Sequence, residues 1–479
     1  GCAMTERKLT GKRKLGYCSG VITESLLYNM FCTYYLVFLT DIIHMKPVLA
    51  GTVSFISICW DAITDPIIGA YADQNGADKR KYMAKSLFPL VLLFIAAFFN
   101  IGTDNSVIQF IYYTAIAMLF WLAYTIYTIP YYAIVAEITQ DYDERTEIRS
   151  TSSLINTAAI FLGNALPAVV PSLFAGVVIS GKHIGESLGW EITAIIMCVL
   201  SLMFGIFTVK SLKGVKLIKA EAENVTGERK KIKAIFAEML EVLKIKPFKW
   251  FAMFIVFFLI ASSMIQSSFE YMIKDCVGAD PEIYMVVVIV ELVVVMAAFI
   301  PIVTKVAEKK DRRFSSLVFM TIMCVGLIGC KIAGVKSIAV VLIITFFMAV
   351  GMANFWTVFY SIAYDLVEVD EFAYGSRRES VITALPQFFQ KFGSAIGVWT
   401  VGFVLQLAGY NKANSVQPAT VAKGIENNVT ILPAAFLVLS IIGVYLYPVT
   451  KDKFSKLKDE LEKKKAGQEY STDGLEKLV

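Results

Sequence analysis

The sequence predicts an all-α membrane protein whose twelve transmembrane helices form two pseudo-symmetric six-helix bundles. Hydrophobic residues make up 57% of the chain and charged residues only 18%, whereas a soluble domain carries about 25% charged residues. Apolar runs of about 20 residues, each long enough to cross a bilayer as a helix, recur along most of the sequence. The predicted spans are residues 17–40, 47–72, 83–101, 106–137, 152–180, 189–209, 250–273, 282–305, 314–334, 337–366, 380–408 and 427–448.

The basic residues predict the orientation of these helices. Most of the 45 Lys and Arg residues fall in the polar segments that alternate on the same side as both termini, and basic segments stay in the cytoplasm. We therefore expect cytoplasmic termini in a multi-pass protein of the plasma membrane, specifically a bacterial inner membrane. The net charge of +5 reflects this bias, so no nucleic-acid partner is expected. The expected partners are the lipid bilayer and a small molecule, and the expected state is a monomer.

One long polar segment, residues 210–249, divides the chain into two halves. Within it, residues 230–243 have the helical periodicity of an amphipathic helix lying on the inner membrane surface. We expect an N-terminal bundle, this cytoplasmic linker, a C-terminal bundle and a cytoplasmic tail. The tail is expected to be a solvated helix followed by disordered residues. The bounds of the four parts are 1–209, 210–249, 250–450 and 451–479.

The two halves resemble each other where the fourth and tenth spans end. Residues 129–137 and residues 358–365 close these spans, and each stretch is followed by acidic residues and then arginine. Such a repeat predicts a transporter with its site near the membrane midplane, between the halves. The charges at these helix ends are expected to form a cytoplasmic gate whose ion pairs break when the inside opens. The gate residues are Glu137, Arg145, Arg149, Asp365, Glu368 and Arg377.

Two acids one helical turn apart are the centre of the predicted chemistry. Asp61 and Asp65 lie on one face of the second span, where each charge costs about 2.5–3.5 kcal/mol. A shared proton or a small monovalent cation would remove their repulsion, and Thr64 would supply a further oxygen. The alternative is that both acids lie at a helix end in water.

Three other charged residues lie well inside predicted spans. Glu24 is either an interfacial residue that reaches water or a ligand-binding acid. Glu291 is either a second proton carrier or a packed, protonated acid. Lys391 requires a carboxylate, an anionic substrate or the loss of its proton, and we expect it to face Asp61 or Asp65.

Polar and aromatic side chains complete the predicted site. Thr125 in the fourth span is placed to direct its hydroxyl at the acid pair, while Thr128 and Tyr132 follow Tyr124 along one face. Trp356 is an aromatic surface of the kind that packs on a sugar ring, although most aromatic residues belong to the core. The candidate cation site is Asp61, Asp65, Thr64 and Thr125, and the candidate substrate site is Glu24, Tyr28, Tyr124, Thr128, Tyr132, Trp356, Gln387 and Lys391.

Cysteine and histidine predict no catalytic or metal chemistry. The eight cysteines form no C-x-x-C pair and lie mostly in apolar runs, as small core residues do. His44 and His183 fall in short polar connections. We expect no cofactor, and no metal other than sodium as a coupling ion.

Five motifs together are specific to one family. They are Asp-Ala-Ile-Thr-Asp-Pro at 61–66, Ile-Pro-Tyr at 129–131, Asp-Tyr-Asp-Glu-Arg-Thr at 141–146, Gly-Ser-Arg-Arg-Glu-Ser at 375–380 and Lys-Phe-Gly-Ser-Ala at 391–395. In these the chain resembles, over nearly its whole length, the glycoside–pentoside–hexuronide cation symporters of the major facilitator superfamily. The resemblance implies the major facilitator fold and cation-site roles for Asp61, Asp65 and Thr125. It also implies that Lys391 lies near both sites and that Trp356 contacts the sugar.

The sequence departs from the melibiose permeases of that family at several of these positions. Glu-Ser at 24–25 stands where they have Lys-Asp, Thr128 where they have Asp, and Tyr132 where they have Trp. Ser153 replaces an Arg, and Thr64 replaces an Asn of the cation site. The resemblance therefore implies that the coupling residues are retained while the galactoside-binding residues are largely lost, so melibiose is not the expected substrate.

The sequence thus predicts a secondary active transporter, not an enzyme, that couples sodium or protons to symport of a glycoside, pentoside or hexuronide by alternating access. Lys391 would attract a uronate, whereas a neutral sugar leaves it free to pair with Asp61. One alternative is a cation-coupled carrier of an amphipathic or lysolipid-like substrate. A remote alternative is an intramembrane aspartyl enzyme, although the Gly-x-Gly-Asp partner that it requires on another helix is absent from the sequence.

Overall fold

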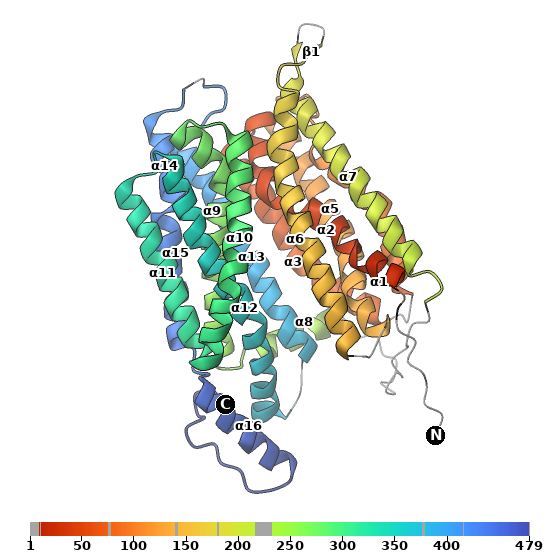
Figure 1. Ribbon diagram of the computed structural model, residues 1–479, viewed down its shortest axis with the longest axis vertical. Coiled ribbons are helices and arrows are strands. Elements are labelled where there is room, and N and C mark those ends of the chain that lie inside the picture. The colour runs from red at the N-terminus through yellow and green to blue at the C-terminus, as the bar shows by residue number, and fades with distance from the viewer. Residues whose placement is uncertain are drawn as a thin grey trace. The chain divides into compact units, whose positions relative to one another are not determined.

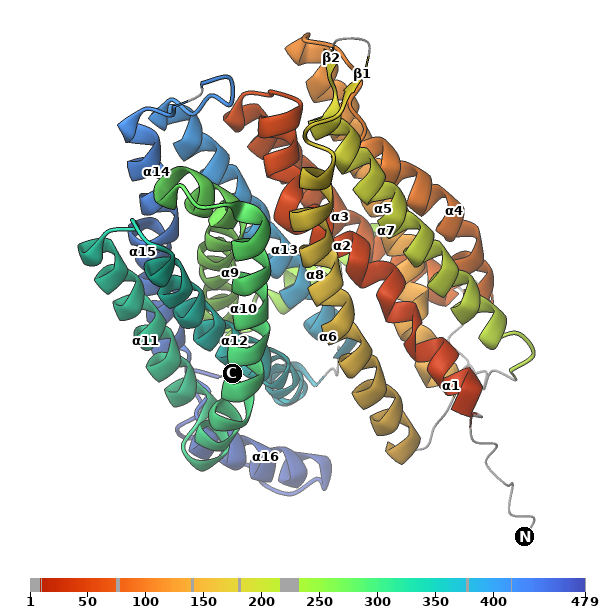
Figure 2. The same cartoon turned by 45° about the horizontal axis from the view of Figure 1, so that its top comes forward.

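The chain forms two compact, largely helical units. The computed structural model describes residues 9, 11–74, 78–138, 142–179, 182–215, 232–375, 379–414 and 416–478. Unit 1 comprises Gly1–Met45 and Ile63–Lys230, and unit 2 comprises Lys46–Ala62 and Lys231–Val479. The helices of each unit are visible in Figure 1 and Figure 2. Among the described residues, the extended structure is one antiparallel pair, β1 (Val178–Ile179) with β2 (Lys182–His183).

Unit 1 is held together by an aromatic core. Its helices are α1 (Gly11–Cys18), α2 (Gly20–Val37), the π-helix η1 (Phe38–Ile42), the second part of α3 (Pro47–Gln74), α4 (Lys79–Ala97), α5 (Ser106–Ile138), α6 (Tyr142–Leu173) and α7 (Gly185–Ser211). The rings of Phe31 and Phe120 stack 4.9 Å apart, and Phe98 meets Phe31 edge-on. Such ring pairs stabilise beyond the area they bury. They fix α2 against α5, the helices that carry Glu24 and Tyr124.

Unit 2 has a comparable aromatic core between α9 and α12. Its helices are the first part of α3, α8 (Ile232–Val242), α9 (Phe248–Tyr271), the π-helix η2 (Met272–Val277), α10 (Pro281–Lys309), α11 (Arg312–Ala333), α12 (Ile338–Tyr374), α13 (Glu379–Ala408), α14 (Ala419–Val429), α15 (Ile431–Leu446) and α16 (Lys451–Lys465). Phe258 and Phe355 stack with ring centroids 4.5 Å apart, and Phe254 lies 5.3 Å from Phe355.

Glycines bring α13 close to α3 and α9 within unit 2. A Cβ on Gly402 would lie 2.4 Å from the Pro47 carbonyl oxygen, and one on Gly51 would lie 3.2 Å from Trp399 Cα. Gly397 is equally tight, because its Cβ would lie 2.7 Å from the Ile260 carbonyl oxygen. Small residues allow such close contact between membrane helices. This packing sets the distance between α13 and the part of α3 that carries Asp61.

Ten helical segments in the described part of the chain are long and apolar enough to cross a membrane. They are Pro47–Ile68, Ser106–Val135, Leu154–Leu173, Gly185–Ser211, Phe248–Val277, Pro281–Lys309, Arg312–Ala333, Ile338–Tyr374, Ala384–Ala408 and Ala419–Leu446. The other two predicted spans, 17–40 and 83–101, correspond to α2 and α4. Glu24 and Asn29 make α2 more polar, and α4 begins with Lys79, Arg80 and Lys81. The all-helical multi-pass architecture is therefore confirmed, whereas twelve spans and cytoplasmic termini stay predictions.

The linker helix forms as predicted, but the end of the tail does not. α8 lies within the stretch expected to be amphipathic, and α16 is the expected tail helix. The residues after α16 were expected to be disordered, and this is wrong. Leu475 and Leu478 are buried, and Lys464 Nζ lies over the rings of Phe372 and Tyr470 at 5.4 and 5.3 Å. Apolar burial and cation–π contacts together order this segment.

Candidate cation and substrate site

An ion pair joins α13 to the first part of α3 in unit 2. Lys391 Nζ lies 2.6 Å from Asp61 Oδ2, and the two side chains are 24% and 3% exposed. A carboxylate this buried needs a positive partner, because desolvation penalises a charge that is left alone. The expected contact between Lys391 and an acid of the second span is therefore confirmed, and that acid is Asp61.

The other acid of the pair contacts a hydroxyl group in unit 1. Thr125 Oγ1 on α5 donates a hydrogen bond to Asp65 Oδ1 across 2.8 Å. Thr64, beside Asp65 on α3, is buried. Pro66 follows inside the helix, and because proline has no N–H, the Ala62 carbonyl lacks its regular helical donor. The turn of α3 around the acids is thus rich in oxygen atoms.

Glu24 is buried and is held by two tyrosine hydroxyls. It is 8% exposed on α2. Tyr124 donates to its Oε2 atom and Tyr132 to its Oε1 atom, both from α5. Tyrosines eight residues apart lie on one helix face, two turns from each other. The structure therefore excludes the interpretation of Glu24 as a residue that reaches water and brings three candidate substrate residues together.

Tyr28 and Thr128 lie beside this carboxylate with different surroundings. Tyr28 follows Glu24 by one turn of α2, is 38% exposed, and its ring lies 6.0 Å from that of Tyr124. The Thr128 hydroxyl donates to the Tyr124 carbonyl of its own helix, across 3.0 Å. Tyr28 thus presents an aromatic face, whereas Thr128 uses its hydroxyl within α5.

A polar network between α2 and α6 was not anticipated from the sequence. Thr33 Oγ1 donates to Asn164 Oδ1 across 2.7 Å, and Asn164 Nδ2 donates to Asn29 Oδ1 across 3.3 Å. Asn29 Nδ2 in turn donates to the Ser25 carbonyl. Asparagines inside apolar spans are the signal that would have indicated such a network, because buried amides require partners.

The candidate substrate residues of unit 2 are spread over two helices. Trp356 on α12 is half-buried and packs against the rings of Phe355 and Phe359, at 5.3 and 6.0 Å. Gln387 is exposed on α13, one turn before Lys391 and on the same helix face. Trp356 therefore packs against other aromatic rings, while Gln387 lies on the helix face that carries Lys391.

The gate acids of unit 2 have partners other than the predicted ones. Asp365 on α12 pairs with Arg312 at the start of α11, and Glu368 lies 3.9 Å from Lys458 of α16. A cavity of about 590 Å³ lies beside the Arg312–Asp365 pair, and residues of α10, α12 and α16 contribute to its lining. In the described part of the chain, Asp365 and Glu368 thus pair with Arg312 and Lys458 and not with arginines that closely follow them in the sequence. Arg377 and the side chains of Glu137, Arg145, Arg149 and Ser153 lie outside the described residues.

The surroundings of Glu291 do not identify its role. It is half-buried on α10, and its Oε2 atom has no hydrogen-bond partner among the described residues. Both sequence interpretations, a second proton carrier and a packed protonated acid, stay open.

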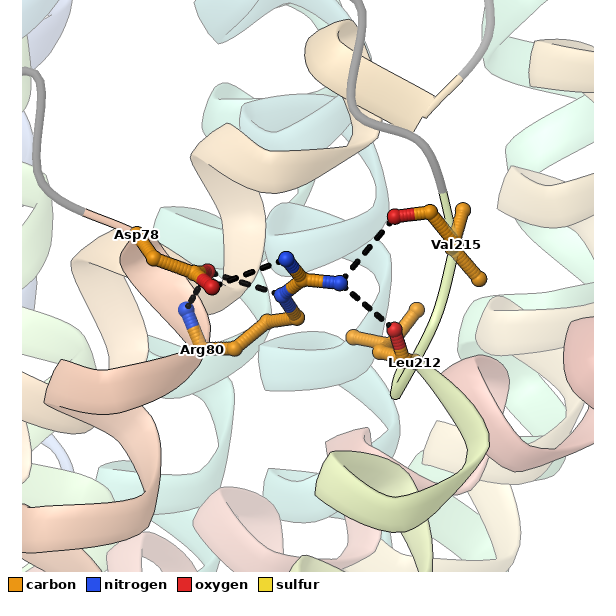
Figure 3. Close-up of polar contacts among 4 residues, drawn as sticks. All are labelled: Asp78, Arg80, Leu212 and Val215. Carbon is orange, nitrogen blue, oxygen red and sulfur yellow. Dashed lines mark hydrogen bonds and ion pairs between the residues drawn. The ribbon is translucent and has the colours of Figure 1, made fainter.

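An arginine anchors the end of α7 in unit 1 (Figure 3). Arg80 forms a paired hydrogen bond with Asp78, and its Nη1 atom donates to the carbonyls of Leu212 and Val215 at 2.9 and 3.1 Å. These hydrogen bonds lower the pKa of the Asp78 carboxyl. Carbonyls at a helix end lack intrahelical donors, so Arg80 ties α4 to the end of α7.

Unit 2 contains a similar arrangement of a capping aspartate and an arginine at the start of α11. Asp311 caps that helix by accepting from the Arg313 backbone N–H, as Asp78 accepts from that of Arg80. Arg313 then donates to the Tyr445 carbonyl near the end of α15. The sequence signal was an acid followed by basic residues before the third and the ninth predicted span, and it was missed.

A solved transporter structure shares this architecture. A bacterial homologue of the human lysosomal transporter Spinster, in an inward-facing and occupied conformation, aligns with a TM-score of 0.68 over 92% of this chain and 97% of its own, at 13% identity. At that identity the likeness shows the fold alone, which is that of a polytopic membrane transporter.

The family follows from the sequence comparison. A family model described as MFS/sugar transport protein matches residues 16–451, so the chain belongs to this family of the major facilitator superfamily. The predicted resemblance is confirmed, and the remote alternative of an aspartyl enzyme is set aside because the family consists of transporters. In the described part of the chain, no group of three or more His, Cys, Asp or Glu residues could hold a metal ion.

Curated relatives align along nearly their whole length. The uncharacterized symporter YnaJ of Bacillus subtilis is 27% identical over 95% of this chain and 96% of its own. The glucuronide carrier protein homologue of Escherichia coli K12 is 22% identical over 97% and 98%. The isoprimeverose transporter of Lactiplantibacillus pentosus is 25% identical over 94% and 91%.

Proposed function

We propose that the chain is a secondary active symporter that couples sodium or protons to the uptake of a sugar of the glycoside, pentoside or hexuronide class. The names of its relatives, a symporter, a glucuronide carrier homologue and an isoprimeverose transporter, support this class. The observation that carries the proposal is the acid pair of α3, in which Asp61 is buried and Asp65 is half-buried. Asp61 contacts an ammonium group and Asp65 a hydroxyl group, so a coupling ion has both charge and oxygen ligands there.

The proposed ion site consists of Asp65, Thr125 and Thr64, with Asp61 one turn away. A small monovalent cation takes oxygen ligands, and a carboxylate with two neighbouring hydroxyls supplies them. Lys391 already contacts Asp61, so we assign the coupling ion to the part of the turn that carries Asp65. That ion is Na⁺ or H⁺.

Coupling follows from competition for the same acids. An ion close to Asp65 also attracts Asp61, which weakens the contact between Asp61 and Lys391. The release of Lys391 then changes the charge that the substrate contacts, and so changes the affinity for the substrate. Substrate binding in turn changes the affinity for the ion by the same factor. Only the empty and the doubly loaded carrier then rearrange easily, which is alternating access with obligatory symport.

The same proposal assigns Arg312–Asp365 and Lys458–Glu368 as cytoplasmic gate pairs, because they join α12 to α11 and to α16. Charge pairs at element ends are typical of elements that open and close. We also propose that α2 and α4 cross the membrane, which gives twelve spans and two cytoplasmic termini. The proposed location is a bacterial inner membrane, and the proposed state is a monomer.

Uptake into proteoliposomes with a panel of sugars, with and without Na⁺ and at two pH values, tests the function. Asp65→Ala should abolish ion-driven accumulation and remove the effect of the ion on substrate affinity, which is about 5- to 150-fold for coupled sites. Exchange of substrate across the membrane should persist. Asp104→Ala, which changes an exposed acid, is the matched control.

Two results would contradict the proposal. Unchanged uphill accumulation by Asp65→Ala would remove the ion-site assignment. Competition by lysolipids, with no competition by any sugar, would favour the carrier of amphipathic substrates instead.

A further inference from the structure

Glu24 forms the centre of a surface that we call the α2–α5 face: Glu24, Tyr28, Tyr124 and Tyr132. Tyr124 is 8% exposed, whereas Tyr132 is 57% exposed. The carboxylate therefore has one inner hydroxyl partner and one outer partner. The outer partner is attached to a ring that is open to a ligand, as is the ring of Tyr28. A carboxylate flanked by accessible aromatic rings has the composition of a polyol site, with few polar groups among apolar ones.

The two helices that form this face carry acids but no basic residues. The sequence has no Lys or Arg between Lys14 and Lys46 or between Lys85 and Arg145, so neither α2 nor α5 carries a basic residue. The basic residues of α4 stand in its first two turns, and Lys210 stands in the last turn of α7. On α6, residues 150–173 contain none. The neighbouring charged group on α3 is Asp65, another acid.

The basic residue that lies well inside a predicted span, Lys391, is already engaged. Lys391 Nζ lies 2.6 Å from Asp61, whose side chain is 3% exposed. A uronate that bound Lys391 would therefore have to displace the buried Asp61 carboxylate from it, and separating a buried ion pair is costly. A uronate placed at the α2–α5 face would instead meet Glu24 at hydrogen-bond range, and like charges in such a site repel strongly.

We infer that Glu24 selects neutral glycosides and excludes uronides within the substrate class of the proposed function, on which this inference rests. The carboxylate accepts hydrogen bonds from substrate hydroxyls, and such charge-assisted bonds are the stronger kind. The outer hydroxyl, that of Tyr132, is the one that a substrate hydroxyl replaces or joins, while Tyr124 keeps the carboxylate in place. The rings of Tyr28 and Tyr132 pack on the apolar face of the sugar.

The selection of neutral sugars over uronides depends on whether the group at C6 can donate a hydrogen bond to Glu24. A neutral hexoside presents a hydroxymethyl group at C6, which donates a hydrogen bond to an acceptor. The matching uronide presents a carboxylate at C6, which donates none and repels Glu24. Sites built around a fixed acceptor reject analogues that cannot donate to it. Discrimination between neutral hexosides and uronides therefore depends on the charge of the Glu24 side chain more than on its size.

Matched pairs of ligands test this on the full-length protein in nanodiscs with saturating coupling ion. The probes are 4-nitrophenyl β-D-glucoside and β-D-glucuronide, the corresponding galactoside and galacturonide, and 4-nitrophenyl β-D-xyloside, which lacks C6. Binding is measured by calorimetry. In the unmodified protein, the neutral member of at least one pair should bind at least about tenfold more tightly than its uronide.

Three variants separate charge from structure. Glu24→Gln should lower the ratio of neutral to uronide affinity at least about tenfold, mainly because the uronide binds more tightly. Tyr132→Phe removes the outer hydroxyl and keeps the charge, so the affinities change while the ratio is preserved. Glu191→Gln is the matched control, because Glu191 is on α7 and accepts from the Asn100 backbone N–H, away from this face.

Each outcome decides the matter. If both uronides bind the unmodified protein as tightly as their neutral partners, the inference alone is overturned, and this comparison needs no variant. A ratio that Glu24→Gln leaves unchanged also overturns it. If no member of any pair binds, the proposed sugar function falls and the inference falls with it.

Discussion

The two units hold their acidic side chains with different kinds of partner. In unit 1, Glu24 accepts hydrogen bonds from two tyrosines and Asp65 accepts one from Thr125. In unit 2, the partners are cations: Lys391 for Asp61 and Arg312 for Asp365. A hydroxyl group satisfies a carboxylate without cancelling its charge, whereas an ammonium or guanidinium group does both. A hydroxyl partner of this kind leaves a carboxylate able to bind a ligand or ion, whereas the cations of unit 2 neutralise Asp61 and Asp365 within the fold.

Removing a cation from unit 2 should have the largest effect. Lys391→Ala removes the ammonium partner of the buried Asp61 carboxylate, and breaking a buried ion pair from one side costs about 3–5 kcal/mol of unfolding free energy. Substrate binding should weaken, and transport should become uncoupled from the ion. The measurements are thermal unfolding of the purified protein and uptake with and without an ion gradient.

The double variant Lys391→Ala, Asp61→Ala sharpens this result. It should recover much of the lost stability, because no unpaired charge remains. A single variant as stable and as well coupled as the unmodified protein would show that the lysine does not neutralise Asp61.

Removing a hydroxyl from unit 1 should have a smaller effect. Thr125→Val keeps the shape of the side chain but removes the donor to Asp65, which costs about 0.5–1.5 kcal/mol. The ion concentration that gives half-maximal uptake should rise up to about tenfold. Thr114→Val on the same helix is the control, because the Thr114 hydroxyl has no partner among the described residues. Equal effects in the two variants would refute the ion-site role of Thr125.

The smallest effect is expected at a partly exposed acid of unit 1, Asp78, which has a cationic partner. Arg80 lowers the folded-state pKa of Asp78 below its ordinary value, which is about 3.9. A lowered pKa stabilises the fold above that ordinary value, and the contribution is lost as pH falls through the folded-state pKa. For an exposed pair it amounts to about 0.2–1 kcal/mol.

Asp78→Asn isolates this contribution, because asparagine also caps a helix. The variant should unfold at a lower temperature than the unmodified protein at pH 7, and the difference should shrink as pH falls below the ordinary aspartate pKa of about 3.9. A difference that stays constant as pH is lowered through the acid range would show that the charge of Asp78 is not the cause.

The fold class and one site contact could be predicted from the sequence, for related physical reasons. Apolar runs must cross the bilayer as helices because backbone groups have no other partners in lipid. In the same way, Lys391 inside a span required an acid, and few acids lay inside spans. The constraint was strong because the number of suitable partners was small.

The remaining contacts depend on how helices rotate about their axes, which the sequence does not reveal. Glu24 meets Tyr124 and Tyr132 only because α2 and α5 turn these faces toward each other. Asp365 had several basic residues within reach near the helix ends, and charge alone could not choose Arg312 among them. The order of the tail depends on Leu475 and Leu478, two isolated apolar residues in a polar stretch.

That tail changes how the second unit should respond to proteases. Residues 451–465 are rich in lysine, which is what trypsin cleaves. Lys464 donates to the Phe372 carbonyl and Lys465 lies 2.8 Å from Glu371, so both side chains are engaged with the end of α12. Cleavage at these two lysines requires local unfolding first. The segment should therefore be digested slowly in the folded protein and quickly once α12 loosens, which makes trypsin sensitivity a reporter of that helix.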